Sequence, residues 1–256
     1  MNQEIKEHIK NALKQGYRID GRKPEEVREV SIEKGVISTA EGSARLKYGD
    51  GELIAGVKIS VGHPFPDSPD QGVIMVNSEM LPLSNEDFET GPPGIDAIET
   101  SRVIDRGIRE SGSIETKKLC IKKGEDVWMI NVDITPINYD GNLIDMGGLA
   151  AIAALEDAKF PTLEEGSVNY KKLTDKGLDL KKQPIPVTVC KVGDVFMVDL
   201  TDEEENTIDS RLTVTVLEDD NICSMQKGGD EPLSIEDIDK MLTIAKKTAK
   251  KLRKNL

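Results

Sequence analysis

The chain has 256 residues, with 34 Lys and Arg against 47 Asp and Glu and a formal net charge of −13. This length is enough for one large domain or two small halves with a real core, and 32% charged residues of both signs exclude a disordered tail. The longest apolar stretch, Gly147–Leu155, is far short of the ~20 residues that a bilayer span needs. The N-terminus lacks the apolar region of a secretory signal. We therefore expect a cytoplasmic protein that does not enter a membrane.

The counts of cysteine and histidine limit the metal and nucleophile chemistry. The cysteines are Cys120, Cys190 and Cys223, without a C-x-x-C pair, and the histidines are His8 and His63. This set argues against a disulfide framework and against zinc sites built from Cys or His. The sequence also has no P-loop and no G-x-G-x-x-G. We therefore expect no metal site and no cofactor of the chain's own.

The first part of the chain predicts a helix followed by a sheet and a second helix. A helix over residues 3–15 ends at Gly16, and a polar turn covers residues 18–22. Gly49-Asp50-Gly51 is typical of a hairpin turn. Apolar alternation predicts strands at Val27–Ile32, Val36–Thr39, Ala44–Tyr48, Leu53–Val61 and Val73–Val76. After Gly91-Pro92-Pro93-Gly94, apolar periodicity predicts a helix over Ile95–Ser111.

The second part repeats this order. A small-residue helix is expected at Asn142–Lys159, a polar loop at 160–183, and a last helix from Ser234, whose Ser-Ile-Glu-Asp is typical of a helix start. The strands predicted here are Lys117–Ile121, Val127–Thr135, Val187–Lys191, Val195–Leu200, Arg211–Leu217 and Asn221–Met225. Strands followed by a helix, twice over, indicate an α+β fold with mixed sheets packed with helices. We expect one body over 1–256 with approximate halves 17–185 and 186–256.

Arg102, Arg106 and Arg109 recur at i, i+4 and i+7 of a predicted helix, within an arc of about 60°. Guanidinium groups in one stripe repel each other unless anions pair with them. Glu99, Asp105 and Glu110 could answer them within the chain, which gives an ordinary salt-bridged face. The alternative is a face that binds phosphate, because the planar fork of Arg matches phosphate oxygens.

An acidic cluster lies between two predicted strands. Carboxylates at this density can bind Mg²⁺ or act as general acids, but a solvated acidic turn is the commoner case. Spacing alone leaves both readings open. The cluster consists of Asp199, Asp202, Glu203, Glu204, Glu205 and Asp209.

Five segments occur in an order that resembles the RNase PH family. They are Arg18-x-Asp20-Gly21-Arg22, Gly42-Ser43-Ala44, the Glu99–Arg109 helix, Asp140-Gly141-Asn142 and Asp199-Leu200-Thr201-x-Glu203-Glu204. Within the family, the chain is similar to the non-catalytic RNase PH-like subunit of the archaeal exosome. The resemblance implies a duplicated RNase PH-like fold and a hexameric ring that phosphorolyses RNA from its 3′ end. In that ring three catalytic subunits alternate with three copies of this partner, and RNA-binding cap subunits and single-stranded RNA complete the assembly.

Two departures from the catalytic pattern concern the phosphorolytic site. Active members carry Asp-Gly-Gly-Thr-Arg to bind phosphate, whereas this chain continues from Asp140 to an apolar Ile144. Active members also place two aspartates where this chain has Glu205 and Arg211. The resemblance therefore implies no catalytic residues here, with phosphate and Mg²⁺ expected at the partner's active site.

The resemblance assigns the arginine stripe to RNA. Arg102 and Arg106 match arginines that the inactive subunit extends across the heterodimer interface to the RNA backbone, and Arg109 joins them or serves folding. Two rival hypotheses remain. The chain could be a self-sufficient RNase PH-type exoribonuclease that uses Glu205 and Asp209 as an acid pair, or a scaffold whose arginines form interface ion pairs.

Overall fold

The computed structural model describes residues 3–164 and 167–256. Its first sheet has the strand order β1-β2-β3-β6-β4, with β5 paired to β6. Only β4 runs parallel to its neighbour within the described part of this sheet. The strands are β1 Val30–Lys34, β2 Gly42–Tyr48, β3 Gly51–Gly62, β4 Val73–Ser78, β5 Cys120–Lys122 and β6 Asp126–Asn138. Side chains of β3 alternate between buried and half-buried positions, as a sheet with one covered face requires.

The second sheet is antiparallel and has the order β10-β9-β11-β12. Its strands are β9 Ile185–Val192, β10 Val195–Val198, β11 Ser210–Val216 and β12 Ile222–Gly229. Every described residue of β9 except Lys191 is buried. The central strand β9 is therefore covered on both faces.

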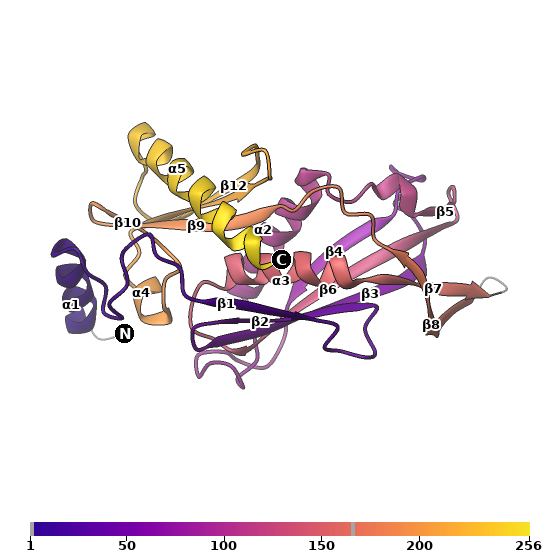
Figure 1. The fold of residues 1–256 in the computed structure, drawn as a ribbon, viewed down its shortest axis with the longest axis horizontal. Helices are drawn as coiled ribbons and strands as arrows, with labels where there is room; N and C mark the ends of the chain where they lie inside the picture. The colour runs from indigo at the N-terminus through magenta and orange to yellow at the C-terminus, as the bar shows by residue number, and fades with distance from the viewer. Residues whose placement is uncertain (1–2, 165–166) are drawn as a thin grey trace.

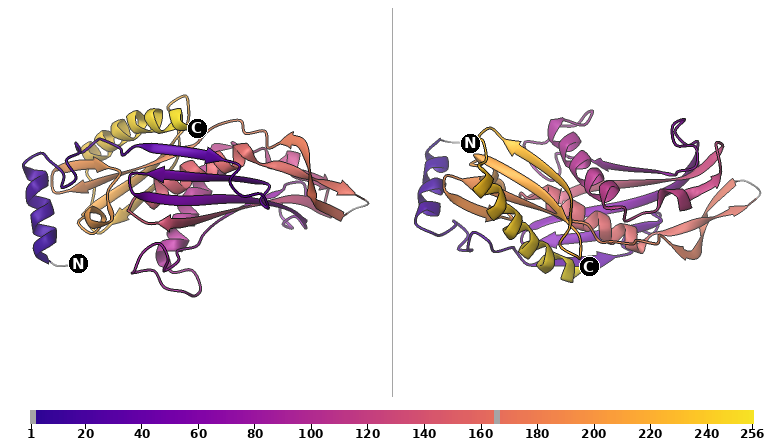
Figure 2. Two further views of the ribbon diagram at one scale, coloured as in Figure 1. Left: turned by 60° about the horizontal axis from the view of Figure 1, so that its bottom comes forward. Right: turned by 90° about the horizontal axis from the view of Figure 1, so that it is seen from above.

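Helices lie between and outside the two sheets (Figure 1). α3 (Leu143–Asp157) contacts β2 and β3 on one side and β9 on the other, and α2 (Ile95–Ser111) lies beside α3 against β4 and β12. α5 (Ile235–Leu252) covers the outer face of β9 and β11. α1 (Gln3–Lys14) lies at the end of the molecule opposite β5 (Figures 1 and 2). The layers are thus sheet, helices, sheet and helix, which confirms the α+β prediction.

Small residues allow α3 to fill the narrow space between the sheets. A Cβ atom added at Gly148 would lie 2.3 Å from Cγ of Pro186 in β9. A Cβ atom at Gly42 of β2 would lie 2.4 Å from the carbonyl oxygen of Ala154 in α3. The glycines therefore let the backbone of α3 approach both sheets.

Three sequence predictions of local structure were wrong. Residues 160–183 are not a polar loop, because β7 (Lys159–Glu164) and β8 (Ser167–Gly177) form a hairpin that projects from the body (Figure 1). Val36–Thr39 is not a strand, because Gly35 has a φ of 71° and turns the chain after β1. The segment expected as strand Lys117–Ile121 is a 3₁₀ turn, η1 (Thr116–Leu119), that leads into β5.

The acidic segment and the chain end also have local helices. Asp202–Glu205 forms the short helix α4, where Thr201 and Glu204 make a capping box. α5 begins with the expected cap at Ser234 and continues into a 3₁₀ turn, η2 (Arg253–Asn255). No helix among the described residues is both long enough and apolar enough to cross a membrane.

Candidate functional site

The three arginines of α2 point outward, as the helical spacing predicted. Arg102, Arg106 and Arg109 are exposed and line one surface groove, which we call the arginine groove. Ile95, Ile98 and Gln226 also line this groove. The arginines are held along one helix because α2 buries its opposite face in the core. Each lies about one helical turn from the next, or about 5 Å along the axis.

The three guanidinium groups differ in their partners. Arg109 pairs with Asp105 at 2.8 Å and donates to the carbonyl of Ile74 at 3.3 Å. Arg106 has only a long hydrogen bond, 3.4 Å, to Oε1 of Gln226 among the described residues. Within that same part of the chain Arg102 makes no hydrogen bond or ion pair. Arg109 is therefore part of an ordinary salt-bridged face, while the charges of Arg102 and Arg106 remain available to a ligand.

Glu99 does not form an ion pair with the three arginines of α2. Its carboxylate turns the other way and pairs with Arg211 of β11 at 2.7 Å. Glu99 thus stands between the arginine groove and a second cavity, since it lines both. This second cavity lies where the family resemblance places a phosphorolytic site.

Polar side chains that line the second cavity are already bonded to other residues of the chain. Ile144, Glu205 and Arg211 all line it. Glu205 accepts hydrogen bonds from the Tyr139 hydroxyl at 2.5 Å and from the backbone N–H of Asn142 at 2.8 Å. The acid and the cation that could act here each have a partner already.

The electrostatics of this cavity reflect the burial of Glu205 and the pairing of Arg211. Burial raises the pKa of Glu205 above its ordinary value, against the hydrogen bonds from Tyr139 and Asn142 that lower it. Burial works to lower the pKa of Arg211, but Glu99 outweighs this effect and the pKa is raised. An apolar Ile144 offers phosphate no charge, and Arg211 is neutralised by Glu99. The residues present do not fit phosphate with Mg²⁺, and among the described residues no group of acidic, His or Cys side chains is arranged to hold a metal.

Asp209 does not join Glu205 in this cavity. Its carboxylate accepts from Lys10 of α1 at 2.8 Å and from the backbone N–H of Gly193 at 2.6 Å. It is absent from the residues that line the cavity within the described chain. The acid pair of the self-sufficient enzyme hypothesis is therefore not assembled.

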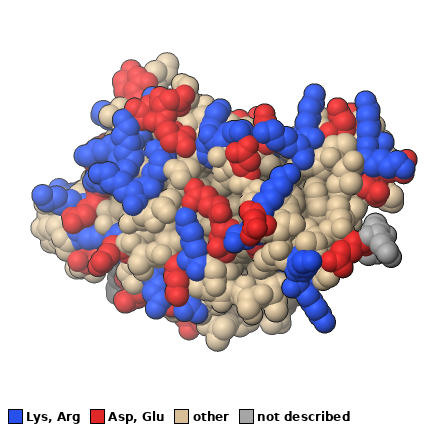
Figure 3. All heavy atoms as spheres, turned by 45° about the vertical axis from the view of Figure 1, so that its right-hand side comes forward, with Lys and Arg blue, Asp and Glu red and all other residues tan. Residues whose placement is uncertain are grey.

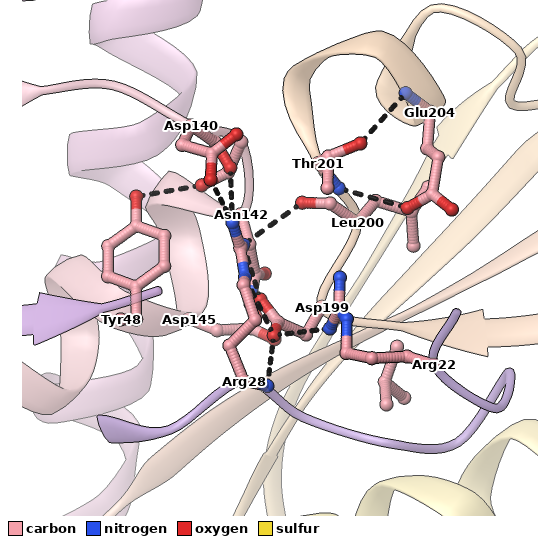
Figure 4. Close-up of polar contacts among 12 residues, drawn as sticks. Arg22, Arg28, Tyr48, Asp140, Asn142, Asp145, Asp199, Leu200, Thr201 and Glu204 are labelled. Atoms are coloured by element: carbon pink, nitrogen blue, oxygen red, sulfur yellow. Dashed lines mark hydrogen bonds and ion pairs between the residues drawn. The ribbon is translucent and has the colours of Figure 1, made fainter. Parts of the chain in front are cut away.

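The motif residues meet Arg28 instead in a partly buried cluster of ion pairs around Asp199, which we call the clamp (Figure 4). Asp199 forms ion pairs with Arg22 at 2.8 Å and with Arg28 at 2.6 Å, and Arg28 also pairs with Asp140 at 2.6 Å. Asn142 donates to Asp199 at 3.0 Å. The clamp ties the segment before β1 to residues beyond β10 and to the turn before α3.

A second pair extends the clamp into the core. Arg18 is 1% exposed and forms two hydrogen bonds with Glu204, one of them 2.9 Å long, and it also donates to the carbonyl of Asp199 at 2.7 Å. Burial alone would raise the pKa of Asp199, but hydrogen bonds and the charge of Arg28 hold it below its ordinary value. Of the two readings left open by the sequence, a solvated acidic turn is therefore wrong for Asp199 and Glu204.

Sequence reasoning found the clamp residues other than Arg28 as parts of motifs, without finding their role. The signal that could have revealed it is the density of arginines at Arg18, Arg22 and Arg28 in a chain whose acids cluster near residue 200. Such complementary runs can pair when the fold brings them together.

The surface charge is mixed. On the face shown in Figure 3, red acidic side chains lie between the blue basic ones over most of the surface. A chain with a net charge of −13 has no general attraction for a polyanion. An anionic ligand would therefore depend on local groups such as those of the arginine groove.

Comparison with known proteins identifies the family. Residues 26–161 match domain 1 of the 3′ exoribonuclease family, RNase PH, and residues 182–248 match its domain 2. The chain belongs to this family, which confirms the resemblance seen in the ordered motifs.

Individual relatives cover nearly the whole chain. The exosome complex component Rrp42 of Methanocella arvoryzae is 45% identical over 99% of this chain and 96% of its own length. A chain of the Archaeoglobus fulgidus exosome with RNA bound to the active site superposes with a TM-score of 0.92 at 42% identity, covering 98% of this chain and 97% of that one. A chain of an archaeal exosome core gives a TM-score of 0.87 at 41% identity, covering 98% and 95%.

Proposed function

We propose that this chain is a non-catalytic subunit of an archaeal exosome ring, where it completes the RNA path of a catalytic RNase PH-like partner. The observation that carries the proposal is the contrast between the two cavities that Glu99 lines. On one side Ile144, Glu205 and Arg211 offer phosphate no free cation, and on the other Arg102 and Arg106 have no ion pair with any described residue. The similarity to exosome components over nearly the full length supports the assembly.

In this proposal the arginines act across the subunit interface. Phosphate and Mg²⁺ belong to the partner's active site, and this chain supplies guanidinium groups to the RNA backbone beside it. Exposed arginines on a rigid helix suit this role, because the planar fork binds phosphate oxygens in pairs. The proposal includes cap subunits above the ring and a cytoplasmic location.

The test measures release of nucleoside diphosphates from a poly(A) oligomer in phosphate and Mg²⁺. We expect no release by this chain alone and activity after mixing with its catalytic sibling. Arg102→Ala and Arg106→Ala should each lower activity at limiting RNA by about tenfold, the scale of a lost charge-assisted hydrogen bond. Arg109→Ala should have a smaller effect, because Asp105 already holds that guanidinium.

Arg45→Ala is the matched control, since Arg45 is a half-exposed arginine of β2 that pairs with Glu52. It should leave activity unchanged. Phosphorolysis by the isolated chain would support a self-sufficient enzyme and contradict the proposal. Full activity in both the Arg102 and Arg106 variants, with rings intact by size-exclusion chromatography, would reduce the chain to a scaffold.

A further inference from the structure

A second hollow continues from the arginine groove. Arg109 lines both, at the end of α2. Across this hollow lie Phe65, from the loop between β3 and β4, and Lys117 and Lys118, from η1. The two hollows therefore adjoin at Arg109, with an aromatic ring and two lysines on its far side.

Phe65 is exposed although its loop is fixed. Its side chain is 58% exposed. The loop is tied to the body where Gly72 donates to the carbonyl of Thr116 and Gly124 donates to that of Pro69, both at 2.8 Å. Pro64 and Pro66 flank the ring and restrict the backbone on both sides. A single exposed ring is common on a protein surface, so what indicates a contact outside the chain is the position of Phe65 beside Arg109 and Lys117 in one hollow.

One cation beside Phe65 remains available to an anionic partner. Lys118 is neutralised by Glu115 and Asp179. Lys117 is exposed and makes no ion pair within the described chain. An aromatic face beside an available cation is the combination that binds single-stranded nucleic acid, where bases stack on rings and cations follow the backbone.

We propose that Phe65 stacks on a base of single-stranded RNA that extends beyond the arginine groove, and that Lys117 contacts the adjoining phosphate. The inference rests on the proposed function, since it extends the same RNA path. The contact would be made by nucleotides that lie further along the RNA from the end held near Arg102. We therefore expect that only RNA long enough to pass Arg109 depends on Phe65.

The experiment uses the assembled ring in phosphate-free buffer, where phosphorolysis cannot proceed. Fluorescence anisotropy would measure binding of two labelled poly(A) oligomers, one that fills only the arginine groove and one that continues past Arg109. Phe65→Ala should weaken binding of the longer oligomer about tenfold and leave the shorter one unchanged. Phe65→Trp should keep the affinity, and its indole fluorescence should be quenched by RNA beyond any change at Trp128 in the unaltered ring.

Tyr17→Ala is the matched control. Tyr17 is an exposed aromatic residue that follows α1, at the end of the molecule opposite β5 (Figure 1). Its loss should not change RNA binding.

The outcomes separate this inference from the proposed function. Unchanged binding in Phe65→Ala, with weakened binding in Arg102→Ala, would overturn the inference and leave the function standing. An equal loss for both oligomers, or loss of the ring itself, would make Phe65 a structural or protein contact and would also overturn it. If Arg102→Ala and Phe65→Ala both bind normally, the proposed function fails with it.

Discussion

Asp145 is a buried carboxyl group in the core between α3 and β9. Its two oxygens accept from the backbone N–H of Thr188 at 2.8 Å and from the Thr188 hydroxyl at 2.7 Å. Burial raises the pKa of Asp145 to about 7, with the charges of Asp199 and Glu205 adding to the shift against the bonds from Thr188. The proton therefore stays on this group in the folded protein where an exposed aspartate has lost it.

This shift predicts a stability that depends on pH. Between about pH 4 and pH 7 the folded state keeps the proton and the unfolded state does not, so stability falls as pH rises and levels off above about 7. The contribution lost is at most about 4 kcal/mol. Asp145→Asn should remove this fall, because an amide can donate to the Thr188 hydroxyl, which then donates to Thr213. The difference in melting temperature between variant and original, measured from about pH 5 to pH 8, should grow with pH; a constant difference would contradict the assignment.

At the scale of single elements, α3 is limited by its contacts with both sheets. Gly148→Ala should destabilise the chain by about 1–3 kcal/mol, although alanine is the better helix former, because the new methyl group would overlap Pro186. Urea unfolding followed by circular dichroism would measure it. Gly56→Ala in β3 is the control, since the nearest atom to its new Cβ is Cδ1 of Ile37 at 3.9 Å. A neutral Gly148→Ala would mean that α3 and β9 can separate at little cost.

The elements differ in how far the sequence predicts them. α2 has the expected bounds, Ile95–Ser111, because its apolar period and the Pro-Gly turn before it agree. The β7–β8 hairpin was missed because its exposed strands, with Tyr170 and Leu173 open to solvent, lack the apolar alternation of a covered sheet. β10 ends at Val198, two residues early, because Asp199 has a φ of 51° that periodicity does not reveal.

On the scale of the whole molecule, the clamp joins segments that are far apart in the sequence. Asp199→Asn should destabilise the chain by about 1–3 kcal/mol, because Arg22 and Arg28 would lose their shared buried partner and keep only their pairs with Asp20 and Asp140. Chemical denaturation would measure the loss. Asp179→Asn is the control, since Asp179 forms only exposed pairs with Lys118 and Lys181, which solvent screens, and its loss should leave stability nearly unchanged. Equal effects of the two changes would show that the clamp adds nothing beyond a surface pair.

The candidate site was predictable only in part. The spacing of Arg102, Arg106 and Arg109 fixes their common face, since it depends on helix geometry alone. Their pairing was not predictable, because the partner of Glu99 is Arg211, more than a hundred residues further on. Phe65 gave no pattern at all in the sequence, because its exposure depends on how the body holds its loop.

The clamp also determines when the chain can complete its folding during synthesis at the ribosome. Arg18 leaves the exit tunnel early, but its acceptors on Val198 and Glu204 follow 180 and 186 residues later. Until they emerge, Arg18 has no partner for the place that it takes in the core. The last steps of folding must therefore wait for the second sheet, and chain truncations before Val198 should leave the N-terminal segment undocked and open to chaperones.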